Sequence, residues 1–305
     1  MSSPAAPDLR GVLPVLATPF AEDMTVDEGA LRAEIDWVFE AGADGVVVAM
    51  VSEILRLAAD EQAELGRMVC SHVAGRGPVV LSVGAESSHV ALRLARRAED
   101  DGASALMAIP PLTVALDSQE TGAYFRTLAD ATSVPLIVQD ASGYVGEPLS
   151  LDLQADLLRA YGEERIQFKP EAVPIGPRLS MLREATDGRA RVFEGSGGAA
   201  LVDSYARGVV GTMPGPDLVW AIRALWDALA ADDHERVRAL DEALSPLMAL
   251  VTSLGSYVAF EKHLLVRQGV LPSTRVREPL GFVLDGETRR RLDELFDRLS
   301  EVVRS

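Results

Sequence analysis

The sequence has little cysteine and histidine and few aromatic side chains. Its single cysteine excludes an internal disulfide, and the four histidines are scattered at spacings that fit no metal-binding motif (Cys70, His72, His89, His234, His263). Aromatic residues make up 5% of the 305 residues, whereas 48% are apolar and 25% charged. This balance is typical of a globular protein and excludes a disordered or collagen-like chain.

Positive charge is also scarce. The chain has 46 acidic and 29 basic residues, a formal net charge of −17, which argues against nucleic acid or an anionic membrane as the main partner. Only two of the basic residues are lysines, Lys169 and Lys262; the other 27 are arginines. Codon bias in a GC-rich genome explains the scarcity of lysine. It does not explain why these two positions keep it.

No apolar run is typical of a membrane span. The longest uncharged run, 243–260, contains Pro246, Gly255 and several hydroxyl residues, which favours a buried helical hairpin. The N-terminal sequence MSSPAAPDLR has no basic stretch followed by an apolar core, so no signal peptide is expected. These features predict a soluble, cytoplasmic protein without a membrane partner.

Short β-branched runs recur along the chain, and a helical pattern follows each of them. The predicted strands cover residues 12–18, 45–50, 78–83, 105–109, 135–139, 166–169, 191–193 and 208–213. The helical patterns between them include a helix from Asp27 to near Gly42, one that starts at Asp60 and Glu61, and others over 87–101, 118–132, 150–160 and 177–185. Continuous apolar strands separated by helices indicate a parallel sheet that is covered on both faces.

Eight such repeats predict an α/β fold, a (β/α)₈ TIM barrel, over residues 1–215, with the eighth helix continuing to about 231. Residues 232–305 are predicted to form a C-terminal helical domain, because after 215 only helical patterns remain (216–231, 234–252, 256–268 and 286–303). The alternative is an open, doubly wound sheet. It would need a glycine-rich turn after the first strand, where the chain has Ala17-Thr18-Pro19-Phe20.

The end of the sixth predicted strand carries one of the two lysines. Active sites of such barrels lie at the carboxyl ends of the strands, and Lys169 stands there. Desolvation would favour its neutral amine, which can attack a keto group and form a Schiff base. The alternative is a lysine in an ion pair at the barrel rim, with Glu171 as its partner. Position alone leaves both open.

Three further features bear on the site: a carboxylate near Lys169, a glycine-rich turn and the second lysine. Glu171 is two residues away, so it faces the same side and could move protons beside a Schiff base, or it could simply begin the next helix. The turn 195–198, Gly-Ser-Gly-Gly, permits close backbone approach to an anion, although glycines also serve tight turns. The second lysine, Lys262, is expected at the surface or in a helix-packing contact.

The chain resembles the dihydrodipicolinate synthase / N-acetylneuraminate lyase superfamily of class I aldolases. The resemblance rests on the opening residues 11–20, GVLPVLATPF, on Glu53 after the second strand, on Pro110-Pro111 after the fourth, and on Lys169 at the Schiff-base position. It implies a barrel with C-terminal helices, a homotetramer or homodimer, and action on a 2-keto acid without metal or cofactor.

Several family motifs are altered. The family's Gly-Thr-Thr-Gly-Glu is replaced by residues 49–53, AMVSE, and its Tyr-Asn-x-Pro by residues 139–142, QDAS, so that Gln139 takes the place of the tyrosine proton shuttle. Leu112-Thr113 replaces a second tyrosine, and Tyr144 aligns with the arginine that holds an aldehyde substrate. Synthase activity is therefore disfavoured, because its acid–base relay is missing.

One branch of the family fits better. Residues 138–140 (VQD), 168–171 (FKPE), 195–198 and 208–214 (GVVGTMP) resemble the 2-keto-3-deoxy-L-arabonate dehydratases. The resemblance implies Lys169, Glu171 and Gln139 as catalytic residues, and a substrate-binding set of Val51, Ser52, Glu53, Gly195, Ser196, Gly197 and Met213. It favours dehydration of a 2-keto-3-deoxy sugar acid. A retro-aldolase releasing pyruvate, a synthase-like condensation and a non-catalytic binding barrel remain alternatives.

Overall fold

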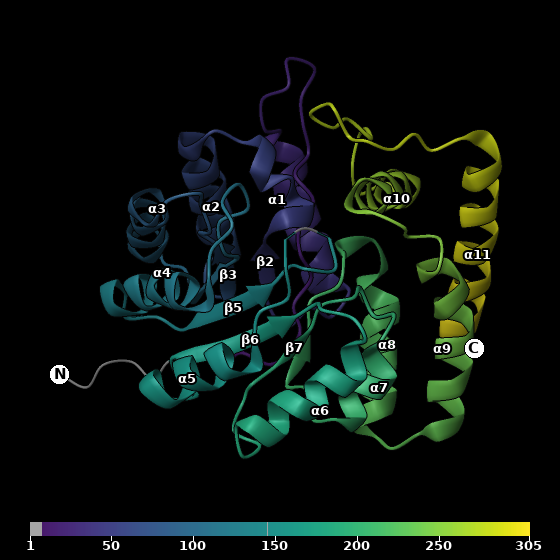
Figure 1. Ribbon diagram of the computed structural model, residues 1–305. Coiled ribbons are helices and arrows are strands. Elements are labelled where there is room, and N and C mark those ends of the chain that lie inside the picture. Colours follow the sequence, from purple (N-terminus) through teal and green to yellow (C-terminus); the bar gives the residue numbers. More distant parts are fainter. Residues whose placement is uncertain (1–7, 145) are drawn as a thin grey trace.

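Eight short parallel strands alternate with helices along the first two-thirds of the chain (Figure 1). The computed structural model describes residues 8–144 and 146–305, so most of the N-terminal segment used for the signal-peptide prediction lies outside the described residues. The strands are β1 (Gly11–Val12), β2 (Val46–Val48), β3 (Val79–Ser82), β4 (Ala105–Ala108), β5 (Leu136–Asp140), β6 (Ile166–Pro170), β7 (Phe193–Glu194) and β8 (Gly211–Thr212).

The helices follow the strands in the predicted order. They are α1 (Glu28–Glu40), α2 (Ala59–Val73), α3 (Ser88–Asp100), α4 (Ser118–Ala131), α5 (Leu151–Tyr161), α6 (Ile175–Ala185), α7 (Leu201–Ala206), α8 (Val219–Ala230), α9 (His234–Met248), α10 (Leu254–Arg267) and α11 (Gly286–Arg304). Side-chain caps fix several starting points, as the sequence indicates. Asp27 accepts a hydrogen bond from Ala30 N, and Ser87 and Ser150 cap α3 and α5 in the same way.

The strands close into a barrel. The continuous ladders run β2-β3-β4-β5-β6 and β1-β8-β7, all of them parallel. Two isolated parallel bridges join these ladders, one between Val15 and Val47 and the other between Phe168 and Val192. The circle of strands is therefore complete, and the predicted α/β barrel is confirmed.

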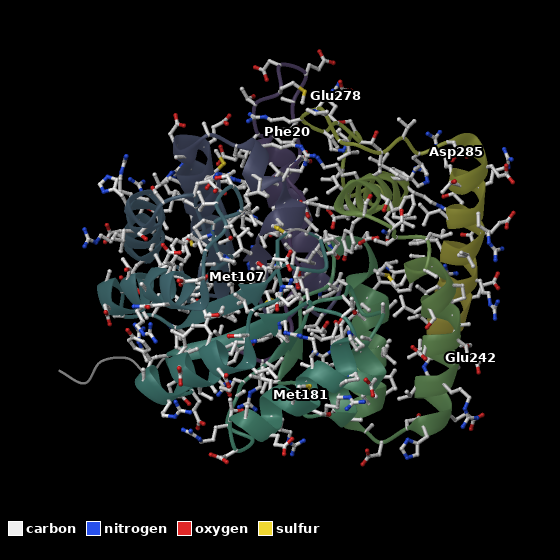
Figure 2. The ribbon with its side chains drawn as sticks, in the orientation of Figure 1. Phe20, Met107, Met181, Glu242, Glu278 and Asp285 are labelled. Atoms are coloured by element: carbon white, nitrogen blue, oxygen red, sulfur yellow. The ribbon has the colours of Figure 1, made fainter. Side chains whose placement is uncertain are left out.

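Apolar side chains fill the barrel and the layer around it. The interior cluster contains residues from strands on every side, with Met107 of β4 near the centre of the molecule in Figure 2. The larger cluster lies between the strands and the surrounding helices. Because both faces of each strand are buried, the strands read as continuous apolar runs rather than as alternating ones.

Several predicted boundaries were wrong. The first strand was predicted over 12–18, but its ladder with β8 contains only Gly11–Val12. Beyond it, Leu13 N and Val15 N still donate to Thr212 O and Pro214 O at 2.9 and 2.8 Å, and Val15 forms an isolated bridge to Val47. The last strand was predicted over 208–213, whereas the ladder contains only Gly211–Thr212. Helix α7 was not predicted. It has six residues, too few to show a helical period.

The C-terminal helices pack beside the barrel. Helix α11 contacts α9 and α8, while α10 crosses the end of the barrel next to η1 (Met50–Ser52) and η3 (Pro216–Leu218) (Figure 1). The uncharged run 243–260 covers the end of α9, a loop and the start of α10, which Ser253 caps. Within the part of the chain that the structure describes, no helix is long and apolar enough to cross a membrane.

Candidate active site

Lys169 lies at the carboxyl end of β6, with Gln139 opposite it on β5. The parallel register pairs these two residues directly. Both are buried, Lys169 at 5% exposure, and both side chains turn to the same carboxylate: Lys169 Nζ and Gln139 Nε2 donate to Glu171 Oε1, the amide at 3.0 Å. The structure therefore brings the three predicted catalytic residues together.

Glu171 is a buried carboxylate whose pKa is subject to opposing effects. Burial raises its pKa above the ordinary value, although the Lys169 ammonium and the Gln139 amide act in the opposite direction. Its second oxygen, Oε2, and the Gln139 oxygen Oε1 have no hydrogen-bond partner among the described residues. Both oxygens can therefore accept hydrogen bonds from the hydroxyl groups of a bound molecule, and the Glu171 carboxylate can also accept a proton.

Gly195 follows β7 and touches the lysine. A Cβ atom at this position would lie 3.0 Å from Lys169 Cε, 3.1 Å from its Cγ and 3.1 Å from its Nζ. The missing side chain leaves the space that the lysine occupies. The predicted site residue Gly195 is thus in contact with the predicted nucleophile.

A cavity of about 350 Å³ opens beside Glu171. Three walls come from the ends of β5, β6 and β7, and the fourth comes from the loop between α9 and α10. The lining residues are Gly143, Tyr144, Glu171, Val173, Ile175, Gly195, Ser196, Ala199, Met248, Val251, Thr252, Ser253 and Leu254. Sequence reasoning missed the α9–α10 wall, because its only signal was an uncharged run that is equally typical of core.

The turn after β7 is already occupied by an internal carboxylate. Ser196 N donates to Glu194 Oε1 at 2.5 Å, and the Ser196 hydroxyl donates to the same oxygen. Thr212 Oγ1 donates to Glu194 Oε2 at 2.7 Å. The interpretation of this turn as an anion cradle was wrong for the Ser196 amide, since a second anion would meet the Glu194 charge. Ser196 lines the cavity all the same.

Four other predicted substrate-binding residues are not among those that line this cavity. Gly197 faces Met248 and Tyr257, and Met213 belongs to the barrel interior. Val51 and Ser52 lie in the turn after β2, where the Thr18 hydroxyl donates to Ser52 O at 2.5 Å. None of these four side chains forms part of the cavity lining described above.

Glu53 ends the same turn and faces away from the cavity. Its backbone is left-handed, with φ 56°, and its carboxylate accepts from Lys262 Nζ at 2.6 Å and from Arg277 N at 3.2 Å. The expectation of a surface position for Lys262 was wrong: its exposed fraction is 1%. Lys262 lies on helix α10, and it contacts Glu53 at the end of the barrel although the two residues are 209 positions apart in the sequence.

Two tyrosines lie near the site. The sequence singled out Tyr144, through its alignment with the family's arginine, but not Tyr257. Tyr144 lines the cavity, and its pKa is raised by burial and by the nearby Glu171 charge. Tyr257 of α10 accepts a hydrogen bond from Gly215 N at 2.8 Å through its hydroxyl oxygen. It thereby joins α10 to the loop that follows β8.

This geometry can be compared with known proteins. A model of the dihydrodipicolinate synthetase family matches residues 8–298, nearly the whole described chain. The chain belongs to this family. It is accordingly an enzyme, a lyase of the class I aldolase type, as the resemblance implied.

Three relatives are similar to this chain over nearly their full length. The chain is 29% identical over 308 residues to the L-2-keto-3-deoxyarabonate dehydratase of Azospirillum brasilense, covering 99% of this chain and 98% of that protein. The structure matches a 4-hydroxy-tetrahydrodipicolinate synthase from Methylacidiphilum fumariolicum SolV with TM-score 0.88 and 22% identity, covering 97% of each chain. A prophage protein of E. coli K12 in complex with pyruvate matches with TM-score 0.86 and 22% identity, covering 96% of this chain and 99% of that one.

Proposed function

We propose that this protein dehydrates a 2-keto-3-deoxy sugar acid through a Schiff base on Lys169. The observation that carries the proposal is the contact of Lys169 and Gln139 with one oxygen of Glu171, whose other oxygen has no partner among the described residues. The full-length similarity to an L-2-keto-3-deoxyarabonate dehydratase and the pyruvate complex of a structural neighbour support the choice of substrate class.

The proposed reaction begins with imine formation. Lys169 transfers a proton to Glu171 through their hydrogen bond, and the neutral amine then adds to the C2 carbonyl of the substrate. The carbonyl oxygen takes that proton back from Glu171 and leaves as water, which gives a protonated imine and restores the Glu171 carboxylate. Burial raises the pKa of Glu171 and so favours its acceptance of the lysine proton.

Elimination follows at the neighbouring carbons. The Glu171 carboxylate removes a proton from C3, and the electron pair forms an enamine with C2. The enamine then expels the C4 hydroxyl, which takes a proton from Glu171 and leaves as water. For a five-carbon acid the conjugated imine then shifts a proton from C5 to C3, and the resulting C4=C5 enol becomes the aldehyde of the semialdehyde. Hydrolysis of the imine consumes one water and frees Lys169. The sum of the steps is the loss of one water from the substrate.

The turn after β2 is proposed to hold the substrate's carboxylate. Met50 and Val51 begin η1, and the first N–H groups of such a turn have no acceptor within it. Both threonine hydroxyls of the family motif are missing here, and the N–H groups of residues 49, 52 and 53 already donate within the turn, so the N–H groups of Met50 and Val51 are the ones proposed to bind the anion. Assembly into a homotetramer or homodimer and a cytoplasmic location stay predictions.

Borohydride trapping tests the proposal. The protein is incubated with pyruvate or a 2-keto-3-deoxy acid and reduced, and the adduct is located by mass spectrometry, with Lys169→Arg as the control. We expect an adduct on Lys169 in the wild type only. No adduct with any 2-keto acid would refute the Schiff base. Among products, a semialdehyde supports dehydration, whereas pyruvate with an aldehyde would show retro-aldol cleavage instead.

Glu171→Gln tests the proton-transfer role separately. The amide keeps the size of the side chain but cannot accept and return a proton, so turnover should fall by roughly 10²–10⁴-fold. Trapping at saturating pyruvate should still give the Lys169 adduct. Wild-type turnover in this variant would reduce Glu171 to a structural role.

A further inference from the structure

The buried ammonium group of Lys262 donates three hydrogen bonds within the protein. Its Nζ donates to Thr18 O at 2.8 Å, to Glu53 Oε1 at 2.6 Å and to Arg275 O at 2.6 Å. It also lies 4.7 Å from the centre of the Phe20 ring. A lysine has three donor hydrogens, so all of them are committed to these acceptors.

This arrangement explains why the position is a lysine. The chain carries 27 arginines and two lysines, so arginine is its usual cation. An ammonium directs three bonds from one atom, whereas a guanidinium spreads five N–H groups over a plane. Three acceptors that surround one nitrogen atom fit the ammonium group of lysine, but they do not fit the planar guanidinium group of arginine. Lysine is therefore kept at this position for its geometry as well as for its charge.

The acceptors of Lys262 fix the turn after β2. Glu53 ends the turn, and Thr18 binds Ser52 O through its hydroxyl. The third acceptor, Arg275 O, belongs to the segment 275–279, which lies at the same end of the molecule as Phe20; Figure 2 labels Phe20 and Glu278 there. Lys262 thus joins helix α10 and this segment to the 49–53 turn.

We propose that Lys262 is a positioning residue that holds the 49–53 turn in the conformation that binds the carboxylate of the keto acid. The inference rests on the proposed function, because that turn is the proposed carboxylate site. Lys262 touches no substrate. It acts through Glu53 and Thr18, and so it sets the affinity for the keto acid while Lys169 sets the chemistry.

Four variants separate positioning from simple stabilisation. Lys262→Arg keeps the charge but loses the convergent geometry, and Glu53→Gln keeps an acceptor but loses the ion pair. The double variant Glu53→Gln/Lys262→Met removes both charges, so that it leaves no unpaired ion in the interior. Arg267→Lys is the matched control, since it changes a cation on the same helix that pairs with Asp293 and Asp297 at the surface.

The measurement is borohydride trapping of Lys169 as a function of pyruvate concentration, together with thermal unfolding. We expect the half-saturating pyruvate concentration to rise roughly ten-fold or more in Lys262→Arg and in the double variant, because misplacement by about 1 Å costs this much or more. Trapping at saturation should stay complete. Arg267→Lys should match the wild type in both.

The outcomes distinguish this inference from the function on which it rests. A folded double variant, or a folded Lys262→Arg, with the wild-type half-saturating concentration would overturn the positioning role and leave the Schiff-base reaction intact. If the rise in half-saturating pyruvate concentration across the variants simply follows the fall in their unfolding temperature, Lys262 is structural only and the inference is wrong. Failure of the wild type to form an adduct would instead overturn the proposed function, and with it this inference.

Discussion

The substitution Gly195→Ala tests the geometry around the nucleophile. The new Cβ would lie 3.0 Å from Lys169 Cε, whereas carbon atoms pack best at about 3.5–4.0 Å, so the lysine side chain must move by roughly 0.5–1 Å. A displacement of about 1 Å at a reacting group costs up to ~10²-fold in rate. We therefore expect kcat/KM to fall by roughly 10–100-fold, which corresponds to about 1.4–2.7 kcal/mol of transition-state stabilisation.

The same substitution should hardly affect folding. Gly195 is not among the glycines with positive φ, and the atoms it would meet belong to a flexible side chain. Thermal unfolding should change by only ~1 kcal/mol or less, because alanine also restricts the unfolded chain. Gly286→Ala, at the exposed start of α11, is the matched control and should leave activity unchanged. A folded Gly195→Ala enzyme with the wild-type rate of imine formation would refute the reasoning.

Three further predictions concern single side chains. Gln139→Leu removes the amide that holds Glu171 at 3.0 Å, so kcat should fall by about ten-fold while pyruvate trapping persists; an unchanged kcat would contradict this. Burial raises the pKa of Glu34 to about 8, so the folded state holds a proton that the unfolded state has already lost above its ordinary pKa. Stability should thus decline as pH rises from about 5 to 8, and Glu34→Gln, which can still accept from Ala17 N, should flatten that decline in thermal unfolding curves; an equally steep decline would count against it. Val251→Phe should fill part of the cavity and raise KM for a six-carbon keto acid but not for pyruvate, and equal effects on both would show that Val251 lies outside the substrate path.

The fold was largely predictable because its signals are local. Continuous apolar runs alternate with helical patterns, and side-chain caps such as Asp27 start the helices within one residue of the prediction. The lengths of the strands were harder to predict from the sequence, because a strand's ladder depends on partners elsewhere in the chain. The strands β1, β7 and β8 show this, since each has only two residues although the apolar runs that contain them are longer.

Part of the site was local as well. Lys169 lies on β6 and Glu171 comes directly after that strand, two residues further on, so the strand period predicts that both side chains point the same way. Their contact with Gln139 required the parallel register of β5 and β6, which the barrel order implies. Lys169 and Glu171 could therefore be singled out from the strand pattern, whereas Gln139 was named only through the family resemblance.

Contacts between distant segments were decided only by the tertiary structure. Lys262 meets Thr18 across 244 residues and Glu53 across 209, and no periodicity links such positions. The same holds for the α9–α10 wall of the cavity and for the Glu194 carboxylate that takes the Ser196 amide. Sequence by itself determined the barrel, its lysine and the carboxylate beside it, because strand and helix periods act over a few residues. Only folding decided which buried charge neutralises which, because that depends on distances that chain order does not set.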